Sequence, residues 1–170
     1  CVEHPIKVVI TNYPEDKVEY FDLPNNPQDP EAGTRPVPFT REVYIDEADF
    51  AEVPPPKFFR MKPQGEVRLM GAYIVKCEEI VKDADGNVVE IRCTADLETG
   101  NGMPTDGRKI KGTIHWLSAK FAKEATLMLY DKLFTIENVN DIPEDKTYND
   151  YLNPASLTKV EHCKIEASLA

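Results

Sequence analysis

Hydrophobic residues along this chain recur with a period close to two, which is the period of side chains that alternate between the faces of a β-strand. The segment TKVEHCKI (158–165) alternates most cleanly, and IKVVITNY (6–13) has the β-branched residues that strands favour. Further strands are predicted at 17–23, 39–45, 109–116 and 127–134, with two more inside 66–94.

The two strands inside 66–94 flank the sequence DADGN, where Asp85 and Gly86 favour the positive-φ turn of a hairpin. Cys77 and Cys93 lie almost symmetrically about this turn. The hairpin therefore predicts that these two cysteines are cross-strand neighbours by register, with no disulfide implied.

Fourteen prolines divide the chain into short pieces, because proline is excluded from helix interiors and from central strands. Five of them fall within 24–38, so we expect an ordered loop or tether there, with no packed element. A single helical turn capped by Asp46 is expected at 46–50, and another around 148–152. What remains is roughly eight short strands, which is typical of an all-β barrel or sandwich.

These strands are spread over the whole chain, and their distribution predicts two small β-barrels. A length of 170 residues suits one ordinary domain or two small ones. We expect the first barrel in residues 1–105 and the second in 106–170, incomplete at its C-terminal end. No repetition of sequence between the two parts is visible.

The composition is that of a soluble globular protein, with 41% hydrophobic and 29% charged residues. No run of about 18 apolar residues could span a membrane, and the N-terminus lacks the plan of a signal peptide. The four cysteines form no zinc motif, so we expect reduced thiols in a cytoplasmic protein without membrane contacts. Because the sequence does not start with Met, we also expect a piece of a longer protein.

The net charge of −10 hides an uneven distribution of charged residues. Residues 57–76 carry five basic side chains against one acidic, a net of +4, and residues 108–123 carry five basic side chains and no acidic one. An acidic body with basic segments can bind a polyanion at one face. Solvated strand faces would give the same pattern, so charge alone leaves both interpretations open.

No catalytic signature is recognisable: the sequence has no GxxxxGK[ST], no GxSxG and no HExxH. The segment KFFRMKPQGEVRLM (57–70) instead interleaves basic and aromatic residues. Arginine pairs with base edges or phosphates, and aromatic rings stack on unpaired bases. The sequence therefore favours a surface that binds single-stranded RNA, against the alternative that Phe58 and Phe59 only cover the core.

Five motifs, in order and at suitable spacing, carry a resemblance to a known family. They are GTRPVPFTREVYIDEADF (33–50), GEVRLMGAYIVKC (65–77), DGRKIKGTIHW (106–116), LYDKLF (129–134) and LNPASL (152–157). Together they resemble the C-terminal anticodon-binding region of class I glutaminyl-tRNA synthetases, which is similar in archaeal and eukaryotic-type glutamyl-tRNA synthetases. The resemblance implies two ribosomal-protein-like β-barrels that exchange their N-terminal strands.

The resemblance also implies which residues contact RNA. Arg68 matches an arginine that helps to read the first anticodon base. Arg60 and Lys57 match residues near the third anticodon base, and Gln28 matches a polar loop residue that approaches the anticodon stem-loop.

Two positions depart from the pattern of the family. Met70 stands where relatives can carry a second arginine, and its side chain offers none of the five donors of an arginine. Phe59 stands where a lysine can precede the match to Arg60, and stacking in place of an ion pair is our hypothesis. The pocket for the middle anticodon base is implied to lie outside residues 1–170.

For function, the resemblance implies recognition of the glutamine tRNA anticodon within an enzyme that attaches glutamine to this tRNA with ATP. We expect no catalytic residue, metal or cofactor in this chain, because ATP and magnesium belong to a catalytic domain that it lacks. The expected partners are the anticodon stem-loop of glutamine tRNA and the catalytic domain of the same chain, in a monomer.

Three alternatives remain open on sequence grounds. The chain could be the corresponding domain of a glutamyl-tRNA synthetase. It could be a ribosomal or stress-related β-barrel that binds ribosomal RNA. It could also be a scaffold whose acidic surface contacts other proteins.

Overall fold

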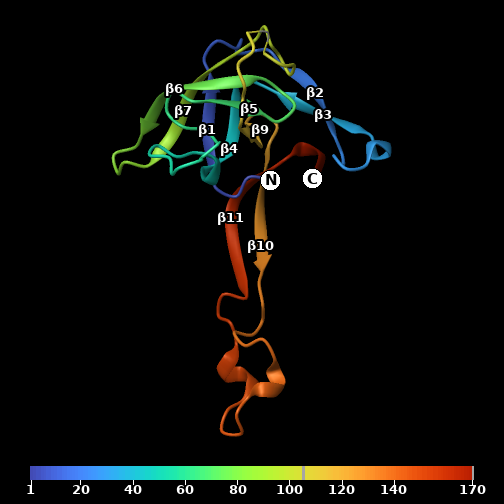
Figure 1. Cartoon of the computed structure of the whole chain (residues 1–170), viewed down its shortest axis with the longest axis vertical. Helices are drawn as coiled ribbons and strands as arrows, with labels where there is room; N and C mark the ends of the chain where they lie inside the picture. The colour runs from blue at the N-terminus through green and yellow to red at the C-terminus, as the bar shows by residue number, and fades with distance from the viewer. Residues whose placement is uncertain (105, 170) are drawn as a thin grey trace.

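The computed structural model describes residues 1–104 and 106–169, and within them the chain is all-β, with eleven strands, five 3₁₀ turns and no α-helix. A head carries a long two-stranded stalk, and both ends of the described part of the chain lie near the junction of the two (Figure 1). The strands are β1 (Pro5–Ile10), β2 (Glu19–Pro24), β3 (Thr34–Phe39), β4 (Glu42–Asp46), β5 (Glu66–Leu69), β6 (Ile74–Lys82), β7 (Val88–Ala95), β8 (Thr113–Ile114), β9 (Leu117–Ser118), β10 (Lys123–Tyr130) and β11 (Leu157–Ile165).

Seven strands form the sheet of the head, in the order β8-β5-β6-β7-β1-β4-β9. Its two edge strands, β8 and β9, are separated in sequence only by His115 and Trp116. Three Cα steps join Ile114 to Leu117, so these edges are no more than about 11 Å apart. The sheet is therefore curled into a half-barrel, and both edge strands come from the part of the chain beyond residue 106.

An aromatic cluster fills the curled sheet. Phe39 is fully buried, and its ring meets Tyr13, Tyr73 and Trp116 edge-on at centroid distances of 5.1, 5.2 and 5.0 Å. Alternate residues of β1, such as Ile6, Val8 and Ile10, point into the same core, as the period of two predicts.

The predicted hairpin is confirmed: β6 and β7 pair antiparallel, and Cys77 faces Cys93 across them as a free thiol pair. The expected turn capped by Asp46 is also confirmed, because the Asp46 side chain accepts a hydrogen bond from the Ala48 amide. A 3₁₀ turn at Tyr148–Tyr151 agrees with the turn expected around 148–152.

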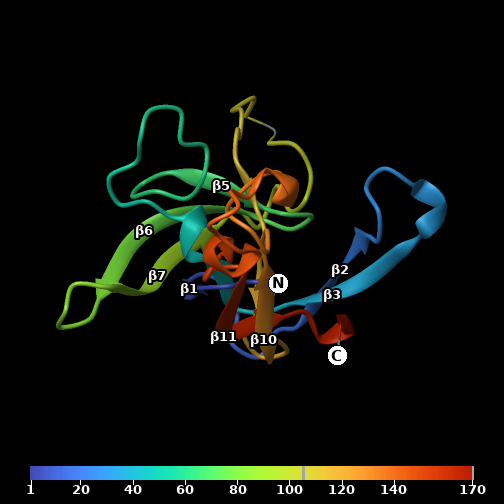
Figure 2. The ribbon, with the colours of Figure 1, turned by 90° about the horizontal axis from the view of Figure 1, so that it is seen from below.

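The expectation of no packed element in 24–38 was wrong. This segment holds a 3₁₀ turn at Pro30–Ala32 and strand β3, which pairs with β2 along its whole length. Successive residues of a strand direct their N–H groups to opposite edges, so Pro36 and Pro38 leave the intervening donors available to β2. β2 and β3 form a separate two-stranded arm that projects from the head (Figure 2).

Of the strand predicted over 109–116, only Thr113–Ile114 (β8) forms a strand. After β8 the chain crosses from one edge of the sheet to the other, where it forms β9. The strand predicted over 127–134 is β10, which runs from Lys123 to Tyr130. β10 pairs with β11 as an exposed ribbon, with a register shift between Ala125 and Leu127. The described residues thus form an all-β structure of one curled sheet and two ribbons.

Two carboxylates fasten the arm to the rest of the molecule. Glu19 of β2 accepts hydrogen bonds from the hydroxyls of Tyr73 (2.6 Å) and Tyr13 (3.1 Å). Buried Glu166 accepts two from the guanidinium of Arg35 in β3, at 2.7 and 3.0 Å. The Tyr73 hydroxyl holds the pKa of Glu19 below its ordinary value, and Arg35 does the same for Glu166.

We expect Tyr73→Phe to lower the free energy of unfolding at pH 7 by about 1–2 kcal/mol, because a partly buried hydrogen bond to a charged acceptor is lost. Since the folded-state pKa of Glu19 is lowered, its stabilisation is present above the ordinary pKa of about 4.3 and is lost as pH falls through the folded-state value. Urea denaturation at neutral and acidic pH measures both effects. Tyr20→Phe, an exposed tyrosine on the same arm, is the control. A Tyr73→Phe loss that is the same at every pH would contradict the role of Glu19.

Candidate nucleic-acid interface

A loop between β4 and β5 carries the first group of basic residues. The loop is closed at its base by a bridge between Phe50 and Met61, and the Met61 side chain is fully buried. After three prolines, Lys57 adopts a φ of 64°, a left-handed conformation that non-glycine residues rarely take. Residues held in such conformations cluster at functional sites.

Gly112, just before β8, brings this loop against the second group of basic residues. A Cβ at Gly112 would lie 1.9 Å from the carbonyl oxygen of Phe59, so only glycine permits the observed approach of the two backbones. The amide of Arg68 also donates to the Gly112 carbonyl at 2.9 Å. The two basic segments of the sequence, far apart along the chain, therefore meet at this point.

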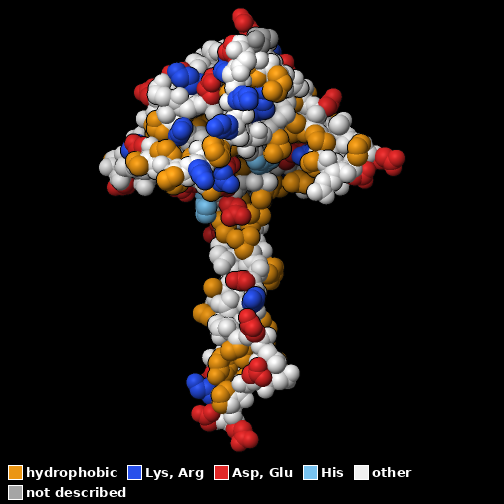
Figure 3. Space-filling view, in the orientation of Figure 1, with side chains coloured by type: hydrophobic (Ala, Val, Ile, Leu, Met, Phe, Trp, Pro, Cys, Tyr) orange, Lys and Arg blue, Asp and Glu red, His pale blue; other side chains and the backbone are white. Residues whose placement is uncertain are grey.

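Between them lies a hollow of about 580 Å³, which we call the basic groove. Its charged lining consists of Lys57, Arg60, Lys62, Lys109, Lys111 and Glu66. The ammonium group of Lys111 lies 5.5 Å from the centre of the Phe59 ring, whose residue is 51% exposed. Figure 3 shows one face of the molecule: Lys and Arg side chains gather on its head, whereas its stalk carries mostly hydrophobic and acidic side chains.

The basic groove keeps most of its charge unpaired. In the described part of the chain, Arg60 is the one groove cation with a carboxylate partner, Asp49, at 3.1 Å. Arg60 also donates to the carbonyl of Ala48 at 3.0 Å, so it holds the base of the loop as well as facing solvent. The lysines of the groove remain available to a polyanion.

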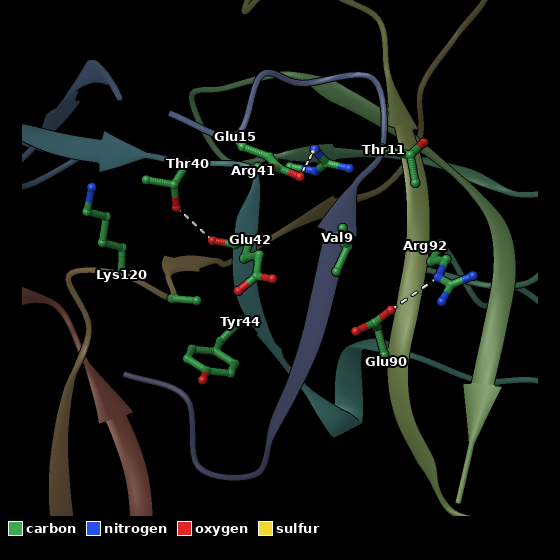
Figure 4. Close-up of a pocket in the computed structure, with 11 residues that line it drawn as sticks. Val9, Thr11, Glu15, Thr40, Arg41, Glu42, Tyr44, Glu90, Arg92 and Lys120 are labelled. Carbon is green, nitrogen blue, oxygen red and sulfur yellow. Dashed lines mark hydrogen bonds and ion pairs between the residues drawn. The ribbon is translucent and has the colours of Figure 1, made fainter. Parts of the chain in front are cut away.

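A second hollow, of about 760 Å³, lies on the outer face of β1, β4 and β7 (Figure 4). Its arginines are neutralised: Arg41 pairs with Glu15 at 2.7 Å, and Arg92 pairs with Glu90 at 3.2 Å and Glu79 at 2.9 Å. This hollow is larger than the basic groove, but it presents little net charge. The basic groove is therefore the better candidate for an RNA contact.

Arg68, predicted to contact a base, lies on the outer face of β5 together with Glu66 of the groove. Its guanidinium donates to the carbonyls of Ala72 (3.2 Å) and Gly102 (2.5 Å). Met70 follows with an exposed side chain, and its carbonyl accepts a hydrogen bond from the indole of Trp116 at 3.0 Å. Arg68 and Met70 thus stand at the head surface that also carries the basic groove.

Gln28 is not part of this arrangement. It lies on the tip of the arm, residues 25–33, where its amide donates to the Asn26 side chain at 3.0 Å. The arm tip and the loop that carries Lys57 lie on opposite sides of the head in both views (Figures 1 and 2). The structure brings Lys57, Phe59 and Arg60 together in the groove, and leaves Gln28 apart.

Sequence reasoning missed Gly112 and the meeting of the two basic segments. A signal was present, because an isolated glycine within a strand pattern marks a close backbone approach. The sequence KIKGTIHW has such a glycine directly after Lys109 and Lys111. The pattern could not show that the backbone approaching Gly112 is that of Phe59.

Cationic grooves with an exposed aromatic ring are typical of domains that bind single-stranded nucleic acids. A family model described as "tRNA synthetases class I (E and Q), anti-codon binding domain" matches residues 1–96, and a second model with the same description matches residues 113–170. The chain belongs to this family of anticodon-binding domains.

Several relatives bear the name glutamine–tRNA ligase. The chain is 51% identical to the one from Rhodopirellula baltica and 48% identical to the one from Pseudomonas putida, each over 170 residues. It is 49% identical over 161 residues to the one from Clostridium kluyveri. These matches cover 100%, 100% and 95% of this chain but 28%, 30% and 29% of the relatives, so the chain spans less than a third of their length.

We expect Gly112→Ala to push the loop away from β8, because the new Cβ would overlap the Phe59 carbonyl. The free energy of unfolding should fall by about 1–3 kcal/mol, as for other overpacked sites. Chemical denaturation measures this loss, and the exposed neighbour variant Thr113→Ala serves as the control. An unchanged denaturation midpoint for Gly112→Ala would mean that the two backbones are not in contact.

Proposed function

We propose that this chain recognises the anticodon loop of glutamine tRNA, as the anticodon-binding part of a glutamine–tRNA ligase. The observation that carries the proposal is the basic groove, in which two basic segments meet beside the exposed Phe59 ring and next to β5. The family of the chain and the names of its relatives support the same function.

In this proposal the lysines of the groove bind backbone phosphates, which fixes the position of the RNA without reading its sequence. Sequence is read by side chains that reach base edges. Arg68 reads the first anticodon base, and Arg60 and Lys57 lie near the third. Gln28, on the arm tip, approaches the anticodon stem-loop.

Phe59 and Met70 are proposed to use apolar contacts where relatives of the family can use charge. The Phe59 ring is half exposed and has a lysine beside it, so a base stacked on the ring would also feel the lysine charge. Met70 exposes 45% of its surface and can pack on a base, but it cannot donate a hydrogen bond.

We also propose that the chain works inside a longer cytoplasmic, monomeric enzyme whose catalytic domain binds ATP and magnesium. Relatives more than three times longer than this chain leave room for such a domain. The stalk supports a further contact with it, because its outer part exposes hydrophobic residues such as Tyr130 (78%), Leu133 (56%) and Tyr148 (60%). Among the described residues no helix is long and apolar enough to cross a membrane.

The two-barrel arrangement with exchanged N-terminal strands is likewise proposed, with residues 1–105 assigned to the first barrel and 106–170 to the second. The support is the ribbon β10–β11, since a two-stranded ribbon is marginally stable alone and has two edges open to pairing. Further strands from the longer protein would complete a barrel around it.

Arg68→Ala should weaken binding to glutamine tRNA by about 1–3 kcal/mol and relax the preference for the first anticodon base. Lys111→Ala should instead weaken binding to every RNA alike and reduce the slope of affinity against salt, because it removes a phosphate contact. Fluorescence anisotropy with labelled tRNA at several salt concentrations measures both. Arg41→Ala, whose arginine is paired with Glu15 in the second hollow, is a control of matched charge.

The same measurement separates the alternatives. Equal binding of wild type and Arg68→Ala at low salt would remove Arg68 from the site. Tighter binding to glutamate tRNA would identify a glutamyl-tRNA synthetase domain, and preference for 5S ribosomal RNA would favour a ribosomal role. Association with proteins that survives ribonuclease, with no RNA affinity, would favour the scaffold.

A further inference from the structure

Residues 97–104 and 106–112, which we call the strap, run between β7 and β8 beside the outer face of β5. Arg108 belongs to the strap and ties it to the sheet at two points. Its guanidinium pairs with Asp96 at the end of β7, with Asp106 of the strap, and with Glu66 of β5 at 3.4 Å. One arginine thus ties two strand ends of the sheet to the strap.

A second series of hydrogen bonds leads from the same Asp96 to Arg68. The Asp96 carboxylate accepts from the amide of Thr99 (3.0 Å) and from its hydroxyl (2.7 Å). The Thr99 carbonyl accepts from the amide of Gly102 at 3.0 Å, and the Gly102 carbonyl accepts from the Arg68 guanidinium. The bonds from Thr99, followed by that from Arg108, hold the pKa of Asp96 below its ordinary value.

We propose that Arg108 is a positioning residue for base recognition: it anchors the strap, and the strap holds the Arg68 guanidinium in a fixed orientation. The inference rests on the proposed function, in which Arg68 contacts a base. It adds a residue outside the basic groove on which the specificity of that contact depends.

The geometry at Arg68 fits this role. The carbonyls of Ala72 and Gly102 bind its two terminal nitrogens, so the plane of the guanidinium is fixed. An arginine has five N–H donors, and these two bonds leave three for a base or phosphate. A side chain oriented before binding loses less conformational entropy when it binds.

The geometry at Arg108 distinguishes it from an ordinary surface ion pair. Two of its carboxylate partners, Asp96 and Glu66, stand at the ends of different strands of the sheet. Its Nε atom is buried 3.4 Å from Glu66 and has no hydrogen-bond partner among the described residues. A planar guanidinium can meet several carboxylates in fixed directions, whereas a lysine ammonium is a point charge on a flexible stem. Lysine should therefore not replace Arg108.

The first test needs no RNA. In the full-length protein that contains this chain, hydrogen–deuterium exchange is followed in peptides covering the strap. We expect Arg108→Ala to speed exchange at the strap, and Arg92→Ala, which removes an arginine paired with Glu79 and Glu90, to leave the strap unchanged. Unchanged exchange in Arg108→Ala would overturn the anchoring role.

The second test is a double-mutant cycle on tRNA binding. Affinity is measured for glutamine tRNA and for the same tRNA with its first anticodon base changed, in wild type, Arg108→Ala, Arg68→Ala and the double variant. We expect Arg108→Ala and Arg108→Lys to reduce the preference for the correct base on the order of tenfold. Arg108→Ala should have no further effect when Arg68 is already replaced.

Additive losses, equal weakening with both tRNAs, or wild-type behaviour of Arg108→Lys would each overturn the proposal, since Arg108 would then act by charge or by general stability. If the wild-type protein shows no preference for the correct base, the proposed function of Arg68 fails. The exchange experiment then still decides whether Arg108 anchors the strap.

Discussion

The structure of the head depends on Trp116, one of the two residues that join the edge strands β8 and β9. Its ring is buried and meets Phe39, the central ring of the aromatic cluster, edge-on at a centroid distance of 5.0 Å, and its indole N–H donates to the Met70 carbonyl at 3.0 Å. One side chain thus holds both edges of the sheet over the core. It also fixes the backbone directly after β5, where the residues proposed to read bases lie.

This closure determines where the basic residues can meet. β8 pairs with β5 directly before Trp116. The residues that precede β8, Lys109 to Gly112, therefore lie alongside the loop that carries Phe59. The loop is fixed at its own base by buried Met61 and by the ion pair of Arg60 with Asp49. A groove between two irregular segments is therefore held by regular structure on both sides, as a preorganised binding site requires.

Local features of the fold could be predicted from the sequence because their causes are local. The period of two predicted strands, Asp85-Gly86 predicted the hairpin of β6 and β7, and Asp46 predicted a capped turn. Strand β3 was missed because its prolines argue against a strand unless they all face the unpaired edge, which only the pairing with β2 reveals. The resemblance to a family supplied Arg68, Arg60 and Lys57, but it could not show that Arg60 pairs with Asp49 or that the Arg68 guanidinium donates to the carbonyl of Gly102.

The distribution of ion pairs explains how an acidic protein can present a cationic site. On the outer face of β1, β4 and β7, basic side chains alternate with carboxylates and are paired across strands, as Lys7 is with Glu90 at 3.0 Å. Such pairs contribute little to stability at an exposed surface, but they cancel the field there. In the groove the lysines lie on irregular segments, and none of them forms an ion pair among the described residues. The one carboxylate of the groove, Glu66, pairs with Arg108 instead, so the lysine charge is not cancelled. With a net charge of −10, the acidic remainder repels a polyanion, which favours its approach to the groove.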